Sequence, residues 1–171
     1  QISFFSFIFC VIASVLFLEG GYSTLFAGAV LAQIASIIDG CDGEISRLKY
    51  QSTAFGGWFD AVLDRYADAF LLFGLTYHLF APTGNLLHLL IGFMAIIGSF
   101  MLSYTADKYD SLMKAKFSKG KGFRIGRDVR IFLIFVCAVC NLPFVTLIVL
   151  AFLMNVETVR RVVVCYRNEQ H

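Results

Sequence analysis

Long apolar stretches, separated by short polar segments, follow one another along the whole chain. An α-helix needs about 17 to 25 predominantly apolar residues to cross the hydrocarbon core of a bilayer. Six stretches approach this length, and the fifth is short: Ile2 to Leu18, Tyr22 to Ile38, Thr53 to Leu79, Leu86 to Thr105, Val129 to Cys140 and Leu142 to Val159. The pattern predicts an all-α polytopic membrane protein of six transmembrane helices, forming one domain over residues 1–171.

The composition agrees with this prediction. Hydrophobic residues make up 58% of the chain and charged residues only 15%, which is too apolar for a soluble helical domain. The chain has five cysteines, and most fall within the apolar stretches or on the side predicted below to be cytoplasmic, so we expect no disulfide framework. We expect no nucleic-acid partner.

Lysine and arginine are confined to alternate connections and to the C-terminal end, apart from one arginine inside the third stretch. The basic residues outside that stretch are Arg47, Lys49, Lys108, Lys114, Lys116, Lys119, Lys121, Arg124, Arg127, Arg130, Arg160, Arg161 and Arg167. Cytoplasmic loops of membrane proteins are enriched in lysine and arginine. We therefore expect a cell-membrane protein whose N-terminus, basic loops and C-terminus are cytoplasmic.

The start of the chain lacks the pattern of a signal peptide. Gln1 leads directly into an apolar run, without a basic flank or a cleavage site. We expect that Gln1 is a cut edge and that the N-terminus is truncated.

Four aspartates lie at or inside the second and third apolar stretches. Asp39 and Asp42 are three residues apart, and Asp60 and Asp64 are four apart, so each pair shares one helical face. Carboxylates near hydrocarbon are costly and mark functional sites. Two such faces opposed would bind one or two divalent cations such as Mg²⁺, Mn²⁺ or Ca²⁺, because hard cations prefer oxygen ligands. We expect this polar cavity near the cytoplasmic face.

Neighbouring residues suggest that the cations would act on phosphate. A pair of metal ions can bridge a pyrophosphate and stabilise the leaving oxygen. Gly43 and Gly56 would let a nucleotide approach the backbone, and Arg47 would bind phosphate. A stripe of small residues in the second stretch would let another helix come close: Gly28, Ala32, Ser36 and Gly40.

Two other interpretations of the aspartates stay open. They could cap helices or pair with Arg47, Lys49 and Arg65. They could also carry a cation in a transporter, which would require polar residues to continue across the bilayer. Beyond Asp68 we see little except Thr76, His78 and His88.

The aspartates lie in a longer pattern with a known counterpart. The segment DGCDGEISR at residues 39–47 is followed, after eight residues, by GGWFDAVLD at residues 56–64. Together they resemble DxxDGxxAR(x8)GxxxDxxxD, the signature of the CDP-alcohol phosphatidyltransferase family. Ser46 stands where the family usually has alanine.

The resemblance implies an enzyme that transfers a phosphoalcohol from a CDP-alcohol to the hydroxyl of a second alcohol and releases CMP. It implies that the metal ligands are Asp39, Asp42, Asp60 and Asp64, with Asp64 also the general base. It further implies a homodimer and the following donor-binding residues: Asp39, Asp42, Gly43, Ser46, Arg47, Gly56 and Asp60.

The acceptor is indicated by the basic residues before the fifth stretch. Arg127 and Arg130 are three residues apart on one helical face, and with Lys108 and Arg124 they would bind a phosphorylated acceptor. The alternative is that this segment only sets the topology and contacts anionic headgroups.

Two strings resemble a particular branch of the family: DGCDGEISRLKY at residues 39–50 and GRDVRIF at residues 126–132. This archaeal branch joins CDP-inositol to inositol-1-phosphate, giving di-myo-inositol-phosphate-phosphate, and is often fused to a cytidylyltransferase that makes the donor. The alternative is a phospholipid synthase that uses CDP-diacylglycerol or CDP-archaeol with inositol phosphate, glycerol phosphate or serine.

Overall fold

The computed structural model describes residues 2–48, 53–116 and 126–169, without the side chains of residues 2, 42–48, 54, 107–116 and 168–169. The described residues form helices and no strands, which confirms the predicted all-α class. The six helices are α1 (Ile2–Leu18), α2 (Tyr22–Leu48), α3 (Ala54–Thr83), α4 (Leu86–Lys116), α5 (Arg127–Val139) and α6 (Pro143–Glu169).

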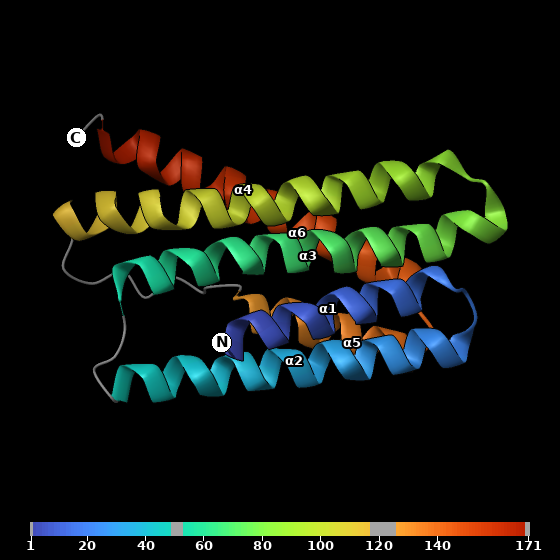
Figure 1. The fold of residues 1–171 in the computed structure, drawn as a ribbon. Coiled ribbons are helices and arrows are strands. Elements are labelled where there is room, and N and C mark those ends of the chain that lie inside the picture. The colour runs from blue at the N-terminus through green and yellow to red at the C-terminus, as the bar shows by residue number, and fades with distance from the viewer. Residues whose placement is uncertain (1, 49–52, 117–125, 170–171) are drawn as a thin grey trace.

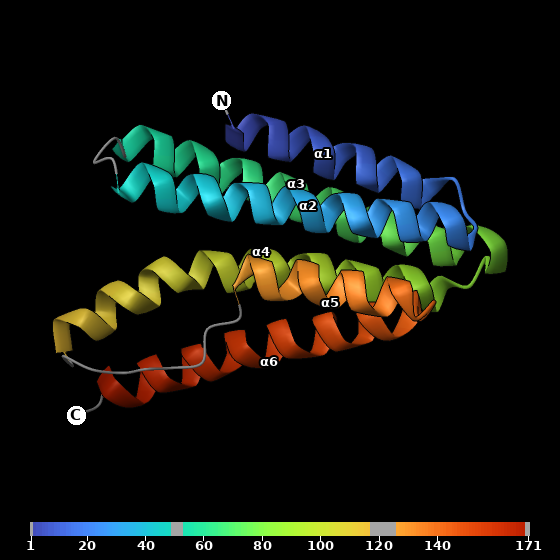
Figure 2. The same ribbon diagram turned by 90° about the horizontal axis from the view of Figure 1, so that it is seen from below.

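The helices are arranged in two layers of three. Figure 2 shows α1, α2 and α3 in one layer and α4, α5 and α6 in the other. Contacts between the layers are made by α3 with α4 and α6, and by α2 with α5. In Figure 1 the short connections α1–α2, α3–α4 and α5–α6 lie at one end of the bundle. The C-terminal ends of α2, α4 and α6 lie at the other end, and each of these helix ends carries or directly precedes basic residues in the sequence.

Three helices continue well past their apolar stretches. The sequence predicts ends at Ile38, Thr105 and Val159, whereas α2, α4 and α6 end at Leu48, Lys116 and Glu169. Hydropathy detects only the part of a helix that suits hydrocarbon, while polar helix formers such as Glu, Lys and Arg extend the helix into water. The whole segment DGCDGEISR is therefore helical, including both of its glycines.

Local signals fix both ends of α3. The Thr53 hydroxyl accepts a hydrogen bond from the Gly56 amide at 3.0 Å and so caps the N-terminus. Gly84 adopts a left-handed conformation, with φ of 59°, and its amide donates to the carbonyl of Phe80 at 2.7 Å. This helix carries Asp60 and Asp64 of the signature, so the position of its first residue determines how deep these two aspartates lie in the bundle.

Alanines share the interior with large apolar side chains, and many large apolar side chains also lie on the exterior. Buried alanines occur in five of the helices: Ala13, Ala29, Ala32, Ala35, Ala67, Ala95 and Ala138. Aromatic side chains such as Phe5, Phe73 and Phe152 are more than half exposed, at 59%, 51% and 65%. Exposed apolar surface on this scale, around an interior with many alanines, is typical of a protein surrounded by lipid.

Two segments are long and apolar enough to cross a membrane by length and composition, at residues 22–41 in α2 and 86–106 in α4. The apolar segment of α1 is shorter. Helix α5 has 13 residues and so spans about 20 Å, less than the hydrocarbon thickness of about 30 Å. The fifth stretch is therefore short, as its sequence predicts.

The small-residue stripe of α2 packs against α1 and α5. A Cβ atom on Gly28 would lie 2.8 Å from the Ala13 carbonyl oxygen of α1, and Ser36 donates to Asp128 of α5 at 3.0 Å. In the described part of the chain, no Cα of α2 comes within 8 Å of a Cα of α3. The helix that comes close to this stripe is therefore α1, which packs against both α2 and α3.

Candidate active site

Three carboxylates converge between α2 and α3. Asp39 of α2 and Asp60 and Asp64 of α3 each offer one oxygen, and these oxygens lie within 4.8 Å of one another. All three side chains are half-buried. The two helices face each other here through their carboxylate side chains and not through close backbone packing. The structure therefore brings together three of the four predicted metal ligands.

Arg127, the first residue of α5, reaches into this cluster from the opposite layer. Its Nη1 lies 2.9 Å from an oxygen of Asp39 and 2.5 Å from an oxygen of Asp64. Carboxylates this close repel one another unless positive charge lies among them. Among the described side chains, Arg127 and the more distant Arg65, 3.9 Å from Asp64, supply the positive charge beside these three carboxylates, so the cluster still attracts a further cation.

A second, deeper layer of charge lies one helical turn further along α3. Asp68 accepts from Nη2 of Arg130 at 2.9 Å and from the hydroxyl of Ser99 at 3.1 Å. Arg130 also donates to Ser99 and approaches the sulfur of Met154 at 3.9 Å. Asp68, Arg130 and Ser99 are 6%, 7% and 4% exposed, respectively. This network joins four helices: α3, α4, α5 and α6.

Sequence reasoning did not identify Ser99 or the partner of Asp68. Asp68 continues the i,i+4 series of Asp60 and Asp64, which indicated a polar stripe but not the helix facing it. Ser99 lies in an apolar stretch, where a single serine is an ordinary packing residue. Only the three-dimensional arrangement shows that the two residues share Arg130.

The remaining predicted site residues are placed as follows. Gly56 lies in the first turn of α3, where a Cβ atom would be 2.9 Å from the capping hydroxyl of Thr53. Arg127 and Arg130 do share one face of α5, but Arg130 is buried against Asp68 whereas Arg127 is among the carboxylates. Six predicted residues cannot be placed in the site. Asp42, Gly43, Ser46, Arg47 and Lys108 are described only as part of their helix backbones, and Arg124 lies outside the described residues.

The donor set suits a hard divalent cation. Three half-buried carboxylates supply only oxygen ligands, and their oxygens are close enough to share one ion. No histidine or cysteine joins this group among the described residues, so a soft metal has no preferred ligand there. Asp39, Asp60 and Asp64 thus fit the Mg²⁺ or Mn²⁺ that the signature implies.

The chain is similar to proteins of known families along nearly its whole length. It is 33% identical over 167 residues to a bifunctional IPC transferase and DIPP synthase of Rubrobacter xylanophilus, covering 98% of this chain and 37% of that protein. It is 30% identical over 141 residues to the archaetidylinositol phosphate synthase of Pyrococcus horikoshii, covering 81% of this chain and 68% of that protein. The chain thus spans little more than a third of the bifunctional relative.

A solved structure shares the fold. The crystal structure of Mycobacterium tuberculosis phosphatidylinositol phosphate synthase (PgsA1) with CDP-DAG bound superimposes with a TM-score of 0.78, at 23% identity. The match covers 96% of this chain and 84% of that one. The family model of the CDP-alcohol phosphatidyltransferases matches residues 1–165, which include the carboxylates of α2 and α3 and both arginines of α5. The chain belongs to the CDP-alcohol phosphatidyltransferase family.

Proposed function

We propose that this chain transfers a phosphoalcohol from a CDP-alcohol to the hydroxyl of a second alcohol and releases CMP. The observation that carries the proposal is the meeting of Asp39, Asp60 and Asp64, whose oxygens lie within 4.8 Å of one another. In the family signature these are the residues of the reacting centre, with Asp42 as the fourth. A bound divalent ion would neutralise the charge of the donor's pyrophosphate.

Asp64 is the proposed general base. It lies ten residues into α3, about 15 Å along the helix from Ala54, and one turn deeper than Asp60. The acceptor hydroxyl would give its proton to Asp64 while its oxygen bonds to the phosphorus distal to the cytidine. The bond between that phosphorus and the oxygen of CMP then breaks, and CMP leaves with the bonding electrons. Donor contacts are assigned to Gly43, Ser46, Arg47 and Gly56 along with the aspartates.

The specific substrates that we propose are CDP-inositol and inositol-1-phosphate, with di-myo-inositol-phosphate-phosphate as the product. The similarity to a DIPP synthase over 98% of the chain supports this choice. The similarity to an archaetidylinositol phosphate synthase favours the alternative of a lipid donor such as CDP-archaeol or CDP-diacylglycerol. With inositol phosphate or glycerol phosphate as the acceptor, both choices share a phosphorylated acceptor, for which Arg127, Arg130, Lys108 and Arg124 are the proposed cationic residues.

Among these, Arg127 has the geometry for such a contact. Its Nη1 already binds carboxylates, while its buried Nε makes no hydrogen bond in the described part of the chain and lies 3.8 Å from a carboxylate oxygen of Asp68. A guanidinium offers five donors in a fixed fork, so it can hold a carboxylate and a phosphate together. We therefore assign the acceptor phosphate first to Arg127.

We further propose that all six helices cross the cell membrane, with the carboxylates toward the cytoplasm. The basic residues on the C-terminal ends of α2, α4 and α6, which lie at one end of the bundle, support this orientation. A homodimer, and a cytidylyltransferase that is fused or acts as a partner, belong to the same proposal. The length of the bifunctional relative supports the second of these.

A product analysis tests the function and the choice of donor together. The purified chain, in lipid nanodiscs with Mg²⁺, receives labelled inositol-1-phosphate with either CDP-inositol or CDP-diacylglycerol, and products are identified by mass. We expect a soluble labelled product from CDP-inositol, CMP in equal amount, and neither with Asp60→Asn. A labelled lipid from CDP-diacylglycerol alone would favour the alternative donor. CMP release without a labelled product would contradict the phosphorylated acceptor.

A further inference from the structure

A pocket of about 540 Å³ opens between α3 and α4, on a different face of α3 from the carboxylates. Its lining includes Trp58, Arg65 and Tyr66 of α3 with Phe100, Ser103 and Tyr104 of α4. Ligand sites commonly have volumes of about 300 to 1,000 Å³ and mostly apolar walls with a few polar groups. The pocket therefore has the size and the lining of a site for an amphiphilic molecule.

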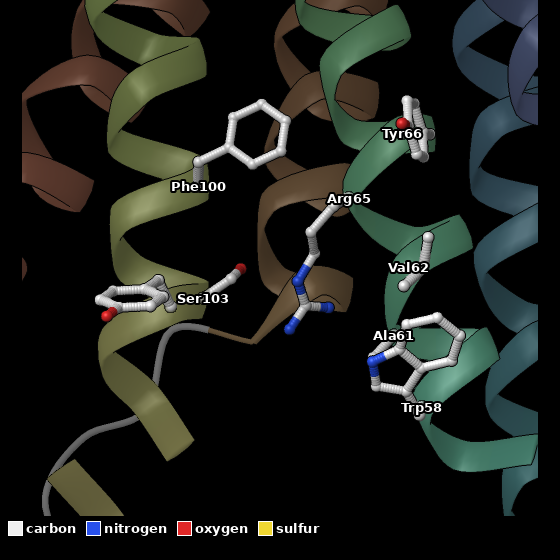
Figure 3. Close-up of a pocket in the computed structure, with 8 residues that line it drawn as sticks. Trp58, Ala61, Val62, Arg65, Tyr66, Phe100 and Ser103 are labelled. Atoms are coloured by element: carbon white, nitrogen blue, oxygen red, sulfur yellow. The ribbon is translucent and has the colours of Figure 1, made fainter. Parts of the chain in front are cut away.

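Among the described residues that line the pocket, Arg65 alone is basic. Figure 3 shows its guanidinium extended into the space between the two helices, facing Ser103, with the indole nitrogen of Trp58 turned toward the same space. Its ion pair with the neighbouring Asp64 is long, at 3.9 Å, whereas Asp64 lies 2.5 Å from Arg127. Asp64 is therefore held mainly by Arg127, and the guanidinium of Arg65 can bind an anion in the pocket.

The depth of the pocket corresponds to the level of lipid headgroups. The apolar segment of α4 ends at Ala106, so Ser103 and Tyr104 lie within one turn of the membrane surface. Trp58, Tyr66 and Tyr104 gather there, and tryptophan and tyrosine concentrate at the boundary between hydrocarbon and water. An arginine at this level attracts anionic lipids.

We propose that this pocket binds one anionic phospholipid of the surrounding leaflet, with its phosphate at Arg65 and an acyl chain along Tyr66 and Phe100. The inference rests on the membrane position of α4 and not on the transferase reaction. A second copy of the chain suits the pocket less well. A second copy would bury the guanidinium of Arg65 in an apolar contact, where a charge is costly unless an acidic group pairs with it, and the described lining of the pocket offers no such group.

Photocrosslinking in nanodiscs tests this site. The full chain is reconstituted in phosphatidylcholine with a trace of phosphatidylglycerol that carries a photoreactive acyl chain, and crosslinked peptides are mapped by mass spectrometry. We expect crosslinks at the pocket residues of α3 and α4, which unlabelled phosphatidylglycerol displaces and phosphatidylcholine does not. Arg65→Gln should lower their yield about fivefold, the effect of one interfacial cation.

Two further variants make the result decisive. Arg167→Gln removes an exposed cation near the end of α6 and should leave the yield at the pocket unchanged. Ser103→Trp fills the pocket and should lower the yield as Arg65→Gln does, which keeps the test valid if that variant does not fold. Crosslinks spread evenly around the helices, or an equal loss with Arg167→Gln, would overturn the proposal. A Ser103→Cys chain that forms a disulfide with a second copy would also overturn it, in favour of a dimer contact.

Discussion

A carboxylate oxygen of Asp68 lies 2.9 Å from Nη2 of Arg130, and both side chains are more than nine-tenths buried. This ion pair joins α3 to α5, although the two helices have no described Cα atoms within 8 Å of each other. Arg127 and Asp64 form a second ion pair between α5 and α3, one turn nearer the start of α5. Long side chains thus bridge the two layers where the backbones remain apart.

Removing one partner of the buried pair should destabilise the protein. Asp68→Asn leaves the charge of Arg130 without its counter-ion, and we expect a loss of about 3 kcal/mol in the free energy of unfolding. Unfolding in mixed micelles measures this change. The double variant Asp68→Asn with Arg130→Gln should recover a large part of the loss, because no unpaired charge remains. Additive losses in the double variant would show that the pair is not coupled.

Metal-dependent transfer should require the carboxylate of Asp60. Asp60→Asn, like Asp39→Asn and Asp42→Asn, removes a ligand charge and should abolish transfer while the thermal unfolding midpoint stays close to that of the unmodified chain. Transfer by the unmodified chain should stop in EDTA and return with Mg²⁺. Undiminished turnover in EDTA would exclude the metal-dependent mechanism.

Asp64→Asn separates proton transfer from binding. The amide keeps the size and hydrogen bonding of the carboxylate but does not accept the hydroxyl proton, so kcat should fall by about 10² or more. Binding of the CDP-alcohol, measured by calorimetry, should persist. Loss of donor binding with the chemical step intact would make Asp64 a metal ligand and not the base.

Arg127 should control the affinity for the acceptor. Arg127→Ala should raise the KM of the phosphorylated acceptor much more than that of the donor, because it removes a cation that can pair with phosphate. Steady-state kinetics with each substrate varied in turn gives both constants. Arg167→Ala, which removes an exposed cation of α6, is the control and should change neither. A wild-type preference for an unphosphorylated alcohol would refute this assignment.

The close contact of α1 with α3 predicts a difference between two glycines of one helix. At Gly74 a Cβ atom would lie 2.7 Å from the Ser14 carbonyl oxygen, whereas at Gly57 nothing lies within 4 Å. Gly74→Ala should therefore lower stability by about 1 to 3 kcal/mol through overpacking. Gly57→Ala should leave it unchanged or raise it by up to about 1 kcal/mol. Equal thermal unfolding midpoints for the two variants would contradict the packing.

The sequence predicted the helices and the aspartate faces because both follow from local spacing. Apolar runs locate the helices, and intervals of three and four residues put Asp39 beside Asp42 and Asp60 beside Asp64. The pairing of helices was not predictable in the same way. Small residues on α2 indicate that some backbone comes close but not which one, and that backbone belongs to α1.

The role of Arg130 shows a similar limit. Its spacing from Arg127 correctly put the two residues on one face of α5, but spacing along one helix does not show what lies opposite. Asp68 of α3 and Ser99 of α4 occupy that position, and both lie far before Arg130 in the sequence.

Around α1, carbonyl oxygens of Ala13 and Ser14 lie where side chains of Gly28 and Gly74 would begin. The separation of these helices is therefore at its lower limit, and it is set by residue volume and not by polarity. Substitution in such a bundle is constrained unequally: phenylalanines on the outer surface can exchange for other apolar residues, whereas the positions that face these carbonyl oxygens can only stay small. In distant relatives, small residues at the positions of Gly28 and Gly74 would therefore mark the close contacts of α1 even where the hydropathy pattern differs.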